Sequence, residues 1–206
     1  MQRSKAYFIS KFIANYVVTH DDMQDLADST LFYNDDVGIN SNSCALISPP
    51  FAVDPLDYSN KRVVVLPSFF NQNPVTFDCH SNSIISILIP TFFTNLQIFD
   101  CSNNGLTSLS ISASCTALVS INASDNSLVT LLCDPTWHNL TSVKLTSNAL
   151  SSAGIDEVII NIANSGAACA VDVSGGTNLS HALWSVPALA AETTIIANGG
   201  SVSSNP

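Results

Sequence analysis

The chain has 206 residues and a formal net charge of −10, and only 11% of its residues are charged, against roughly 25% in typical soluble proteins. Apolar residues make up 46%, which excludes an ordinary disordered chain, because such chains are poor in apolar residues and rich in charge. Lys and Arg together number six, so the composition argues against binding to nucleic acid, and no apolar stretch is long enough to predict insertion into a membrane.

Residues 1–33 are predicted to form two short helices. Phe8, Phe12 and Tyr16 recur every four residues in the first helix, while Met23 and Leu26 give the second an apolar face. Lys11 interrupts the apolar stretch and no small-residue cleavage site follows, so we interpret this segment as part of the mature protein. A helix pair of this size cannot enclose a large core. Its five apolar side chains either pack on the repeats that follow or attach the chain to another protein.

Residues 34–73 are predicted to form a linker and a capping strand. Asn40–Ser43 and the prolines at 49, 50 and 55 are typical of loops. The apolar run Arg62–Leu66 predicts a strand that covers one end of the following core.

A 22-residue repeat dominates the remainder of the chain, residues 74–206. One column of the repeat is apolar and the other is asparagine, and both recur at the same constant interval. The apolar column consists of Phe77, Phe99, Ile121 and Val143, and the asparagine column of Asn82, Asn104, Asn126 and Asn148. Two independent columns with the same spacing indicate a tandem structural unit.

The repeat predicts short parallel strands that are stacked one upon another. Apolar residues that alternate with polar ones point to one face of a strand. An asparagine after each strand can bond to the free backbone groups of a bend, because a buried amide needs hydrogen-bond partners. The four asparagines would then form a ladder. A single unit cannot bury its own apolar face, and about three or more are needed.

The spacing lengthens toward the C-terminus. Val171 follows Val143 at a longer interval than the repeat, and in this unit Gly176 replaces the asparagine. The insert Ser151–Ser165 has apolar residues at helical spacing, with Ser152 as the expected N-cap and Gly166 as the expected stop. A final unit is predicted to run from Thr193 through Ile196 to Asn205. The other return segments, which lead on the convex side from one strand to the next, are expected to hold turns only.

The strand residues that point away from the core are the candidate binding residues. They form two columns of mostly polar side chains. The first column is Asp78, Asp100, Asn122, Lys144 and Asp172, and the second is His80, Ser102, Ser124, Thr146 and Ser174. Such a strip can bind a polar ligand, as the concave faces of repeat proteins often do, or it can consist of solvated strand residues without a ligand.

The sequence predicts no metal site, no cofactor and no catalytic residues. Asp78 and Asp100 would lie side by side, but two carboxylates fall short of the six to eight oxygen ligands of calcium. The four histidines are far apart in the sequence, and none of the six cysteines forms a C-x-x-C pair. Cys79 and Cys101 lie in adjacent units, where a disulfide or two buried free thiols are both possible, and the parallel register favours the thiols.

The pattern L-x-x-L-x-L-x-x-N-x-L resembles that of leucine-rich repeat proteins. The segment from Asn148 to Val158, together with Asp172–Asn178, also resembles the closing repeat of leucine-rich proteins encoded by tailed bacteriophages. Thr19–Ser29 resembles a short N-terminal helix of some phage fibre and virion proteins. These resemblances imply an α+β fold, namely a leucine-rich repeat solenoid with parallel β-strands on its concave face, mostly turns and one helix on its convex face, and a short helical N-terminal segment.

The resemblance also implies a function. We expect a non-enzymatic virion structural protein of a tailed bacteriophage, such as a head or tail fibre or a decoration protein. Its N-terminal segment would contact other virion proteins, and its repeats would be displayed for contact with a host surface protein or glycan, in a possible homo-oligomer. The alternative is a bacterial leucine-rich adhesion or protein-binding module on the cell surface.

Overall fold

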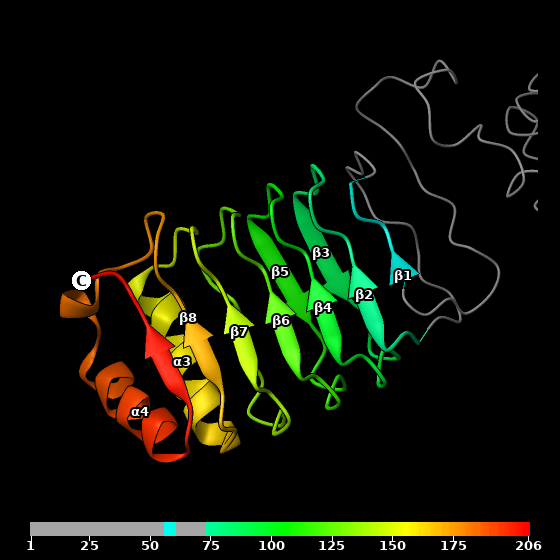
Figure 1. Cartoon of the computed structure of the whole chain (residues 1–206). Coiled ribbons are helices and arrows are strands. Elements are labelled where there is room, and N and C mark those ends of the chain that lie inside the picture. The colour runs from blue at the N-terminus through cyan, green and yellow to red at the C-terminus, as the bar shows by residue number, and fades with distance from the viewer. Residues whose placement is uncertain (1–55, 61–72) are drawn as a thin grey trace, which may run out of the picture.

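The computed structural model describes residues 56–60 and 73–206, and it contains a seven-stranded sheet in which every strand pairing is parallel (Figure 1). An α+β fold built on a parallel sheet is therefore confirmed. The strands of this sheet are β1 (Leu56–Asp57), β2 (Thr76–Asp78), β4 (Ile98–Asp100), β6 (Ser120–Asn122), β7 (Ser142–Lys144), β8 (Ala170–Asp172) and β9 (Ser201–Ser203). The predicted helices in residues 1–33, with their attachment residues, and the predicted strand Arg62–Leu66 lie outside the described residues.

The repeat spacing appears directly in the strand register. Phe77 lies opposite Phe99, Phe99 opposite Ile121, and Ile121 opposite Val143. Each repeat thus adds one short strand beside the preceding one and then returns to begin the next. We call one such repeat, with its strand, bend and return segment, a coil.

The core runs through the stack as columns of apolar side chains. The strand centres Phe77, Phe99 and Ile121 are fully buried, and the rings of Phe77 and Phe99 are stacked with centroids 5.4 Å apart. The return segments bury a second set of apolar side chains at the same spacing: Leu96, Leu118, Leu140, Ile84, Leu106, Leu128 and Leu150. The apolar residues of each coil are therefore buried mainly by contact with the two neighbouring coils.

The repeated asparagines join adjacent coils through both ends of their amide groups. The Asn104 amide nitrogen donates to the carbonyl of Cys79 in the preceding coil and to the carbonyl of Cys101 in its own. Its oxygen accepts from the backbone nitrogen of Ile84 at 3.0 Å. Equivalent bonds between coils are made by Asn126 and Asn148, and Asn82 donates to the carbonyls of Tyr58 and Cys79.

In the β8 coil the asparagine is displaced rather than lost, which corrects the prediction that Gly176 replaces it. Gly176 does lie opposite Asn148, but Asn178 donates to the carbonyl of Leu145 and accepts from the nitrogen of Leu150. Gly176 has a positive φ of 58°, and a Cβ there would come within 2.6 Å of the Asn148 carbonyl oxygen. Gly176 allows its backbone to approach that of Asn148 closely, and the side-chain amide that bonds to the preceding coil comes two residues later, at Asn178.

The predicted insert is a helix, α3 (Ser152–Ser165), on one side of the sheet (Figure 1). Its N-cap is Ser151 rather than Ser152, and the Ser151 hydroxyl accepts from the Gly154 nitrogen at 3.2 Å. Gly166 ends the helix in the left-handed conformation, as expected. Ile155, Val158 and Ile159 are buried against the core.

The prediction for the last unit was wrong, because Thr193 and Ile196 belong to a second helix, α4 (Val186–Ala197). The last strand, β9, begins only at Ser201, and Val202 lies opposite Val171. Ser185 caps α4, and a proline occupies its first turn. A short 3₁₀ segment, η3 (His181–Leu183), precedes this helix. The return side therefore carries two helices in the described residues, not one.

Two further strands lie on the return side, where only turns were expected. β3 (Ser86–Ile89) and β5 (Ser108–Ile111) pair in parallel to form a separate two-stranded sheet, with Ile87 opposite Leu109. Their side chains alternate between exposed and buried, as a strand with one face on the core requires.

The sheet also begins earlier than predicted. β1, within the segment interpreted as a linker, pairs with β2 so that Asp57 lies opposite Asp78. None of the helices in the described residues has both the length and the apolar character needed to span a membrane.

Candidate functional site

Polar side chains at the carboxyl ends of the strands make the same local contact in coil after coil. In β1, β2, β4, β6 and β8 the last strand residue is Asp or Asn, and its side-chain oxygen accepts from the backbone nitrogen two residues later. For Asp100 the bond to the Ser102 nitrogen is 2.9 Å, and the Ser102 hydroxyl donates to the same oxygen at 2.6 Å. Asn122 with Ser124 and Asp172 with Ser174 repeat both bonds. These side chains therefore hold the bends that follow these five strands.

The bend itself needs an unusual backbone conformation. The residue after each second-column position has a positive φ: 55° at Ser81, 51° at Asn103 and 54° at Asp125. Residues other than glycine seldom adopt this conformation, and Asn and Asp tolerate it best. Strand-end hydrogen bonds thus offset part of the cost of a tight bend.

The ten predicted binding residues lie in two columns across the sheet. Asp78, Asp100, Asn122, Lys144 and Asp172 are opposite one another in the strand register. Nine of the ten predicted residues are partly exposed. The side-chain oxygens of Asp78, Asp100, Asn122 and Asp172 already accept hydrogen bonds within the chain. Lys144 breaks the pattern because an ammonium group cannot accept a hydrogen bond. Its side chain is exposed, and it is the only Lys or Arg within residues 56–60 and 73–206.

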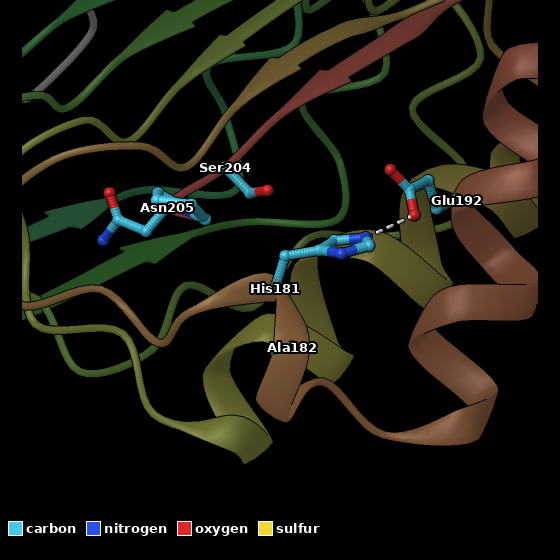
Figure 2. A pocket seen from close by; sticks show the side chains of 6 residues that line it. His181, Ala182, Glu192, Ser204 and Asn205 are labelled. Atoms are coloured by element: carbon cyan, nitrogen blue, oxygen red, sulfur yellow. Dashed lines mark hydrogen bonds and ion pairs between the residues drawn. The ribbon is translucent and has the colours of Figure 1, made fainter.

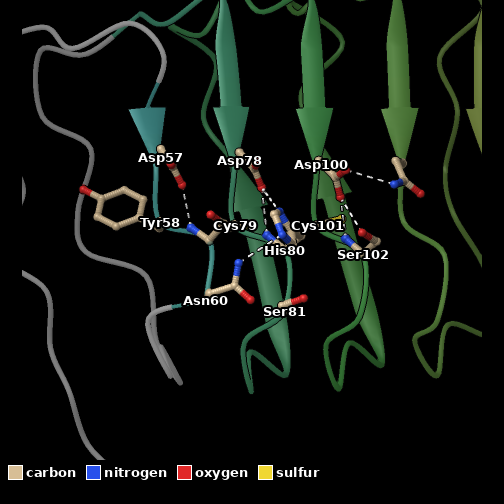
Figure 3. Close-up of polar contacts among 12 residues, drawn as sticks. Asp57, Tyr58, Asn60, Asp78, Cys79, His80, Ser81, Asp100, Cys101 and Ser102 are labelled. Atoms are coloured by element: carbon tan, nitrogen blue, oxygen red, sulfur yellow. Dashed lines mark hydrogen bonds and ion pairs between the residues drawn. The ribbon is translucent and has the colours of Figure 1, made fainter. Parts of the chain in front are cut away.

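The β2 coil differs from the others because His80 stands where they have Ser or Thr (Figure 3). The Nδ1 atom of His80 lies 2.7 Å from the Asp78 carboxylate, and its Nε2 atom lies 3.2 Å from the Asn60 amide nitrogen. Asp100 on the adjacent strand completes a group whose possible ligand atoms all lie within 4.8 Å of one another. The site therefore contains an imidazole and two carboxylates on one open face.

A second group of polar side chains lines an open hollow of about 400 Å³ at the C-terminal end of the stack (Figure 2). His181 Nε2 lies 2.8 Å from Glu192 on α4, and the His181 ring packs 4.7 Å from that of Trp184. Ser204 and Asn205 form the opposite wall. Asn205 also donates to the carbonyl of Asn178, so this wall belongs to the fold as well as to the hollow.

The described histidines bond to carboxylate, amide or carbonyl groups. His138 Nδ1, for instance, contacts the Ser165 carbonyl at 2.6 Å. Within the described part of the chain, no histidine ring is hydrogen-bonded to a serine hydroxyl or a cysteine thiol. A hydrogen bond of that kind is what a base–nucleophile pair of covalent catalysis requires.

The cysteines of the described residues are buried free thiols, and Cys79 and Cys101 are not joined by a disulfide. Burial raises the pKa of Cys115 to about 11 and that of Cys169 to about 12. Burial also raises the pKa of Cys79, Cys101 and Cys133, and nearby negative groups add to the effect. Such thiols stay protonated near neutral pH and behave as small apolar side chains.

Sequence reasoning missed three of the polar contacts described above. Asp57 and Ser59 extend the strand-end pattern into the β1 coil, with a bond of 2.8 Å. Asn60 lies beside His80, and His181 pairs with Glu192. The Asp-x-Ser spacing of residues 57–59 could have revealed the first of these. The contact of Asn60 with His80 depends on which coils adjoin, and that of His181 with Glu192 depends on how η3 packs beside α4. The sequence alone carries no signal for either.

No protein-family model matches the chain, and the search of curated proteins gave no match.

Proposed function

We propose that the chain is a leucine-rich repeat solenoid that acts as a non-enzymatic structural and binding component of a tailed-bacteriophage particle. The observation that carries the proposal is the polar face of the seven-stranded sheet, formed by the two columns of predicted binding residues, beside which Ile98 is the large apolar side chain exposed on these strands. Residues at equivalent positions of successive coils lie opposite one another across it. Regular polar columns on a rigid sheet suit contact with an extended partner.

The assignment to leucine-rich repeats is supported by the asparagines. In this family's pattern the asparagine follows the strand, and here its amide bonds to the backbone of the preceding coil. The constant strand register supports the same assignment. The helix α3 and the glycine-containing bend after β8 form the part of the chain that resembles the closing repeat of phage proteins.

The composition of the polar face favours display over catalysis. Its side chains are mainly hydroxyls, amides and carboxylates held by short local bonds, and Lys144 adds a single positive charge. Such groups can make many weak hydrogen bonds to a hydroxyl-rich partner, as a glycan is. The aromatic and arginine anchors that dominate tight protein interfaces are absent from the ten predicted binding residues.

Residues 1–33 take the attachment role in this proposal. Phe8, Phe12, Tyr16, Met23 and Leu26 would contact other virion proteins and leave the repeats exposed on the particle.

The direct test is mass spectrometry of purified phage particles, with labelling by antibodies raised against residues 73–206. We expect the chain at a fixed copy number per particle and label on the particle exterior. Absence from particles, combined with label on the surface of bacterial cells, would instead favour the bacterial adhesion module. Absence from both would contradict the proposal and its alternative.

Contact with a host surface is tested separately by binding of the full chain to glycan arrays and whole cells. Lys144→Ser and Asp172→Asn should each weaken binding, because they remove a charge from the polar face, and an amide at position 172 can keep the bend contact, as Asn122 does. Ser110→Ala, on the exposed side of the opposite sheet, is the matched control. Uniformly blank arrays and cells would remove the glycan part of the proposal.

A further inference from the structure

We propose that Asp78, His80 and Asp100 form a binding site for a divalent transition-metal ion of the Zn²⁺ type. The inference departs from the sequence-based expectation that the chain has no metal site. It also stands apart from the proposed virion role, because it rests only on the geometry of two adjacent coils.

The three side chains converge from two strands and the bend between them (Figure 3). Asp78 and Asp100 end the adjacent strands β2 and β4 and lie opposite each other in register. His80 follows Asp78 by two residues, so both side chains leave the same face of the chain. The side chain of His80 is 34% exposed and that of Asp78 is 29% exposed, so an ion can reach both from solvent.

The separations suit a single ion. Possible ligand atoms of all three residues lie within 4.8 Å of one another, and the Nδ1 atom of His80 is 2.7 Å from Asp78. Zinc bonds of about 2 Å place two ligand atoms at most about 4 Å apart. Small rotations of these partly exposed side chains would bring the three donors to that distance.

The donor set is specific to this position of the stack. At the place of His80, the other coils have Ser102, Ser124, Thr146 and Ser174. The hydroxyls of Ser102, Ser124 and Ser174 donate to the strand-end oxygen, whereas an imidazole adds a nitrogen lone pair suited to borderline metal ions. Like charges directly opposite each other in a sheet are also unfavourable, and an ion between Asp78 and Asp100 would offset that repulsion.

Neighbouring side chains already orient the proposed ligands. The Ser102 hydroxyl and the Asn122 amide donate to the two oxygens of Asp100, at 2.6 and 2.9 Å. Asn60 lies beside the far nitrogen of His80, where an amide oxygen could accept its N–H after rotation of the amide. Metal-bound histidines commonly have such a partner on the second ring nitrogen.

The same donor set argues against calcium and magnesium. Calcium takes six to eight oxygen ligands, and magnesium prefers oxygen in octahedral geometry. One nitrogen and two carboxylates instead match zinc sites with three protein ligands and a water in the fourth position.

The test is a calorimetric titration of the full, metal-free chain with Zn²⁺, with Mg²⁺ and Ca²⁺ as parallel arms. Two variants copy residues that adjacent coils already use, so both should fold. His80→Ser copies Ser102, and Asp100→Asn copies Asn122. His181→Ser is the matched control, since it removes an imidazole that also pairs with a carboxylate but has only one carboxylate beside it.

We expect the wild type to bind Zn²⁺ at one site that both variants lose and the control keeps. Loss of a ligand should weaken binding at least about 100-fold, because changing only the hydrogen-bond partner of a metal ligand costs about 10–100-fold. Zinc bound elsewhere on the chain would persist in every variant. Circular dichroism verifies that each variant is folded.

Three results would overturn the proposal. The first is a wild-type chain that shows no Zn²⁺ site. The second is a Zn²⁺ site that His80→Ser leaves unchanged. The third is equal binding of Ca²⁺ or Mg²⁺, which would indicate a general cation surface. Absence of the chain from phage particles would leave this inference intact, so the two proposals fail separately.

Discussion

At the scale of single residues, the asparagines that follow the strands connect one coil to the next. Asn148 is the clearest case because it is only 3% exposed. Its amide nitrogen donates to the Ala123 and Leu145 carbonyls, and its oxygen accepts from the Leu128 nitrogen. A leucine of similar size could fill the space but could make none of these bonds. This explains why a polar residue recurs at a buried position.

Asn148→Ala should therefore destabilise the protein strongly. The substitution leaves buried backbone groups without partners, each costing about 1–3 kcal/mol, so we expect a loss of about 2–4 kcal/mol in the free energy of unfolding. Urea denaturation measures the change. Asn95→Ala, at an exposed site, is the control and should change stability by less than about 0.5 kcal/mol. Equal effects of the two substitutions would contradict the role of the buried amide.

The buried cysteines predict a loss of stability in alkaline solution. Their thiols have raised pKa values in the folded chain and ionise near the usual value of 9.0 once unfolded. Above pH 9 the unfolded chain thus binds fewer protons than the folded chain, and the free energy of unfolding must fall as pH rises. Below pH 9 both forms hold the protons and the effect disappears. The fall should continue through about pH 11 for Cys115 and about pH 12 for Cys169.

Denaturation curves recorded between pH 8 and pH 11 test this prediction. Cys115→Ala should reduce the slope of stability against pH above pH 9, because one of the groups responsible has been removed. An unchanged slope in this variant would count against the assignment to Cys115.

At the scale of elements, the sequence predicted what its repeat spacing encodes and missed what depends on neighbouring coils. The strands centred on Phe77, Phe99 and Ile121 follow from the spacing of apolar residues. β1 was missed for two reasons. The interval from Leu56 to its partner Phe77 is one residue shorter than the repeat, and Lys61 occupies the position at which the repeat has asparagine. The pair β3 and β5 depends on adjacent return segments, which are placed side by side only once the coils stack.

The second helix shows a different limit of sequence reasoning. The run Thr193–Ile196 consists of β-branched residues, which favour strands, and it was therefore predicted to begin the last coil. Ser185 and the following proline start a helix instead, and burial of Ala188, Ala191 and Ile195 stabilises it. Packing against α3 and β9 thus outweighs the local preference.

The candidate site divides in the same way. Its columns could be predicted, because residues at equal positions of a repeat lie opposite one another. The bonds by which the strand-end Asp and Asn oxygens hold the bends could not be predicted, because they depend on the backbone conformation after each strand. The grouping of His80 with Asp100 could not be predicted either, because the two residues belong to different coils.

Gly154 in α3 gives a prediction at this scale. Replacing an exposed helical glycine with alanine normally stabilises a helix by about 1 kcal/mol. Here a Cβ would come within 2.2 Å of the Val129 carbonyl oxygen, so α3 would have to move off the core. Gly154→Ala should lower stability by about 1–3 kcal/mol in thermal or urea unfolding.

The control for Gly154→Ala is Asn164→Ala, which lies on the exposed side of the same helix. It should leave stability unchanged or raise it slightly, because alanine favours helix. If Gly154→Ala proved equally harmless, the close approach of α3 to the return segment at Val129 would be wrong.

At the scale of the whole molecule, the described chain is a one-dimensional stack in which each coil contacts mainly its neighbours. The strand order follows the chain from β1 to β9 along the sheet, and β3 and β5 extend the same order on the other side (Figure 1). In such proteins stability is approximately a sum over units and the contacts between neighbours. The polar face and the proposed metal site both depend on this order, because each is built from equivalent residues of adjacent coils.

The central claim is that one repeat is one interchangeable structural unit, and deletion of a single repeat tests it most directly. Removing residues 104–125 joins Asn103 to Asn126 and keeps every later position in register, whereas removing residues 104–114 shifts the later residues by half a coil. Circular dichroism with thermal unfolding should show that the full-repeat deletion folds cooperatively, with a lower Tm, and that the half-repeat deletion does not fold cooperatively. Cooperative folding of both chains, or of neither, would contradict the account.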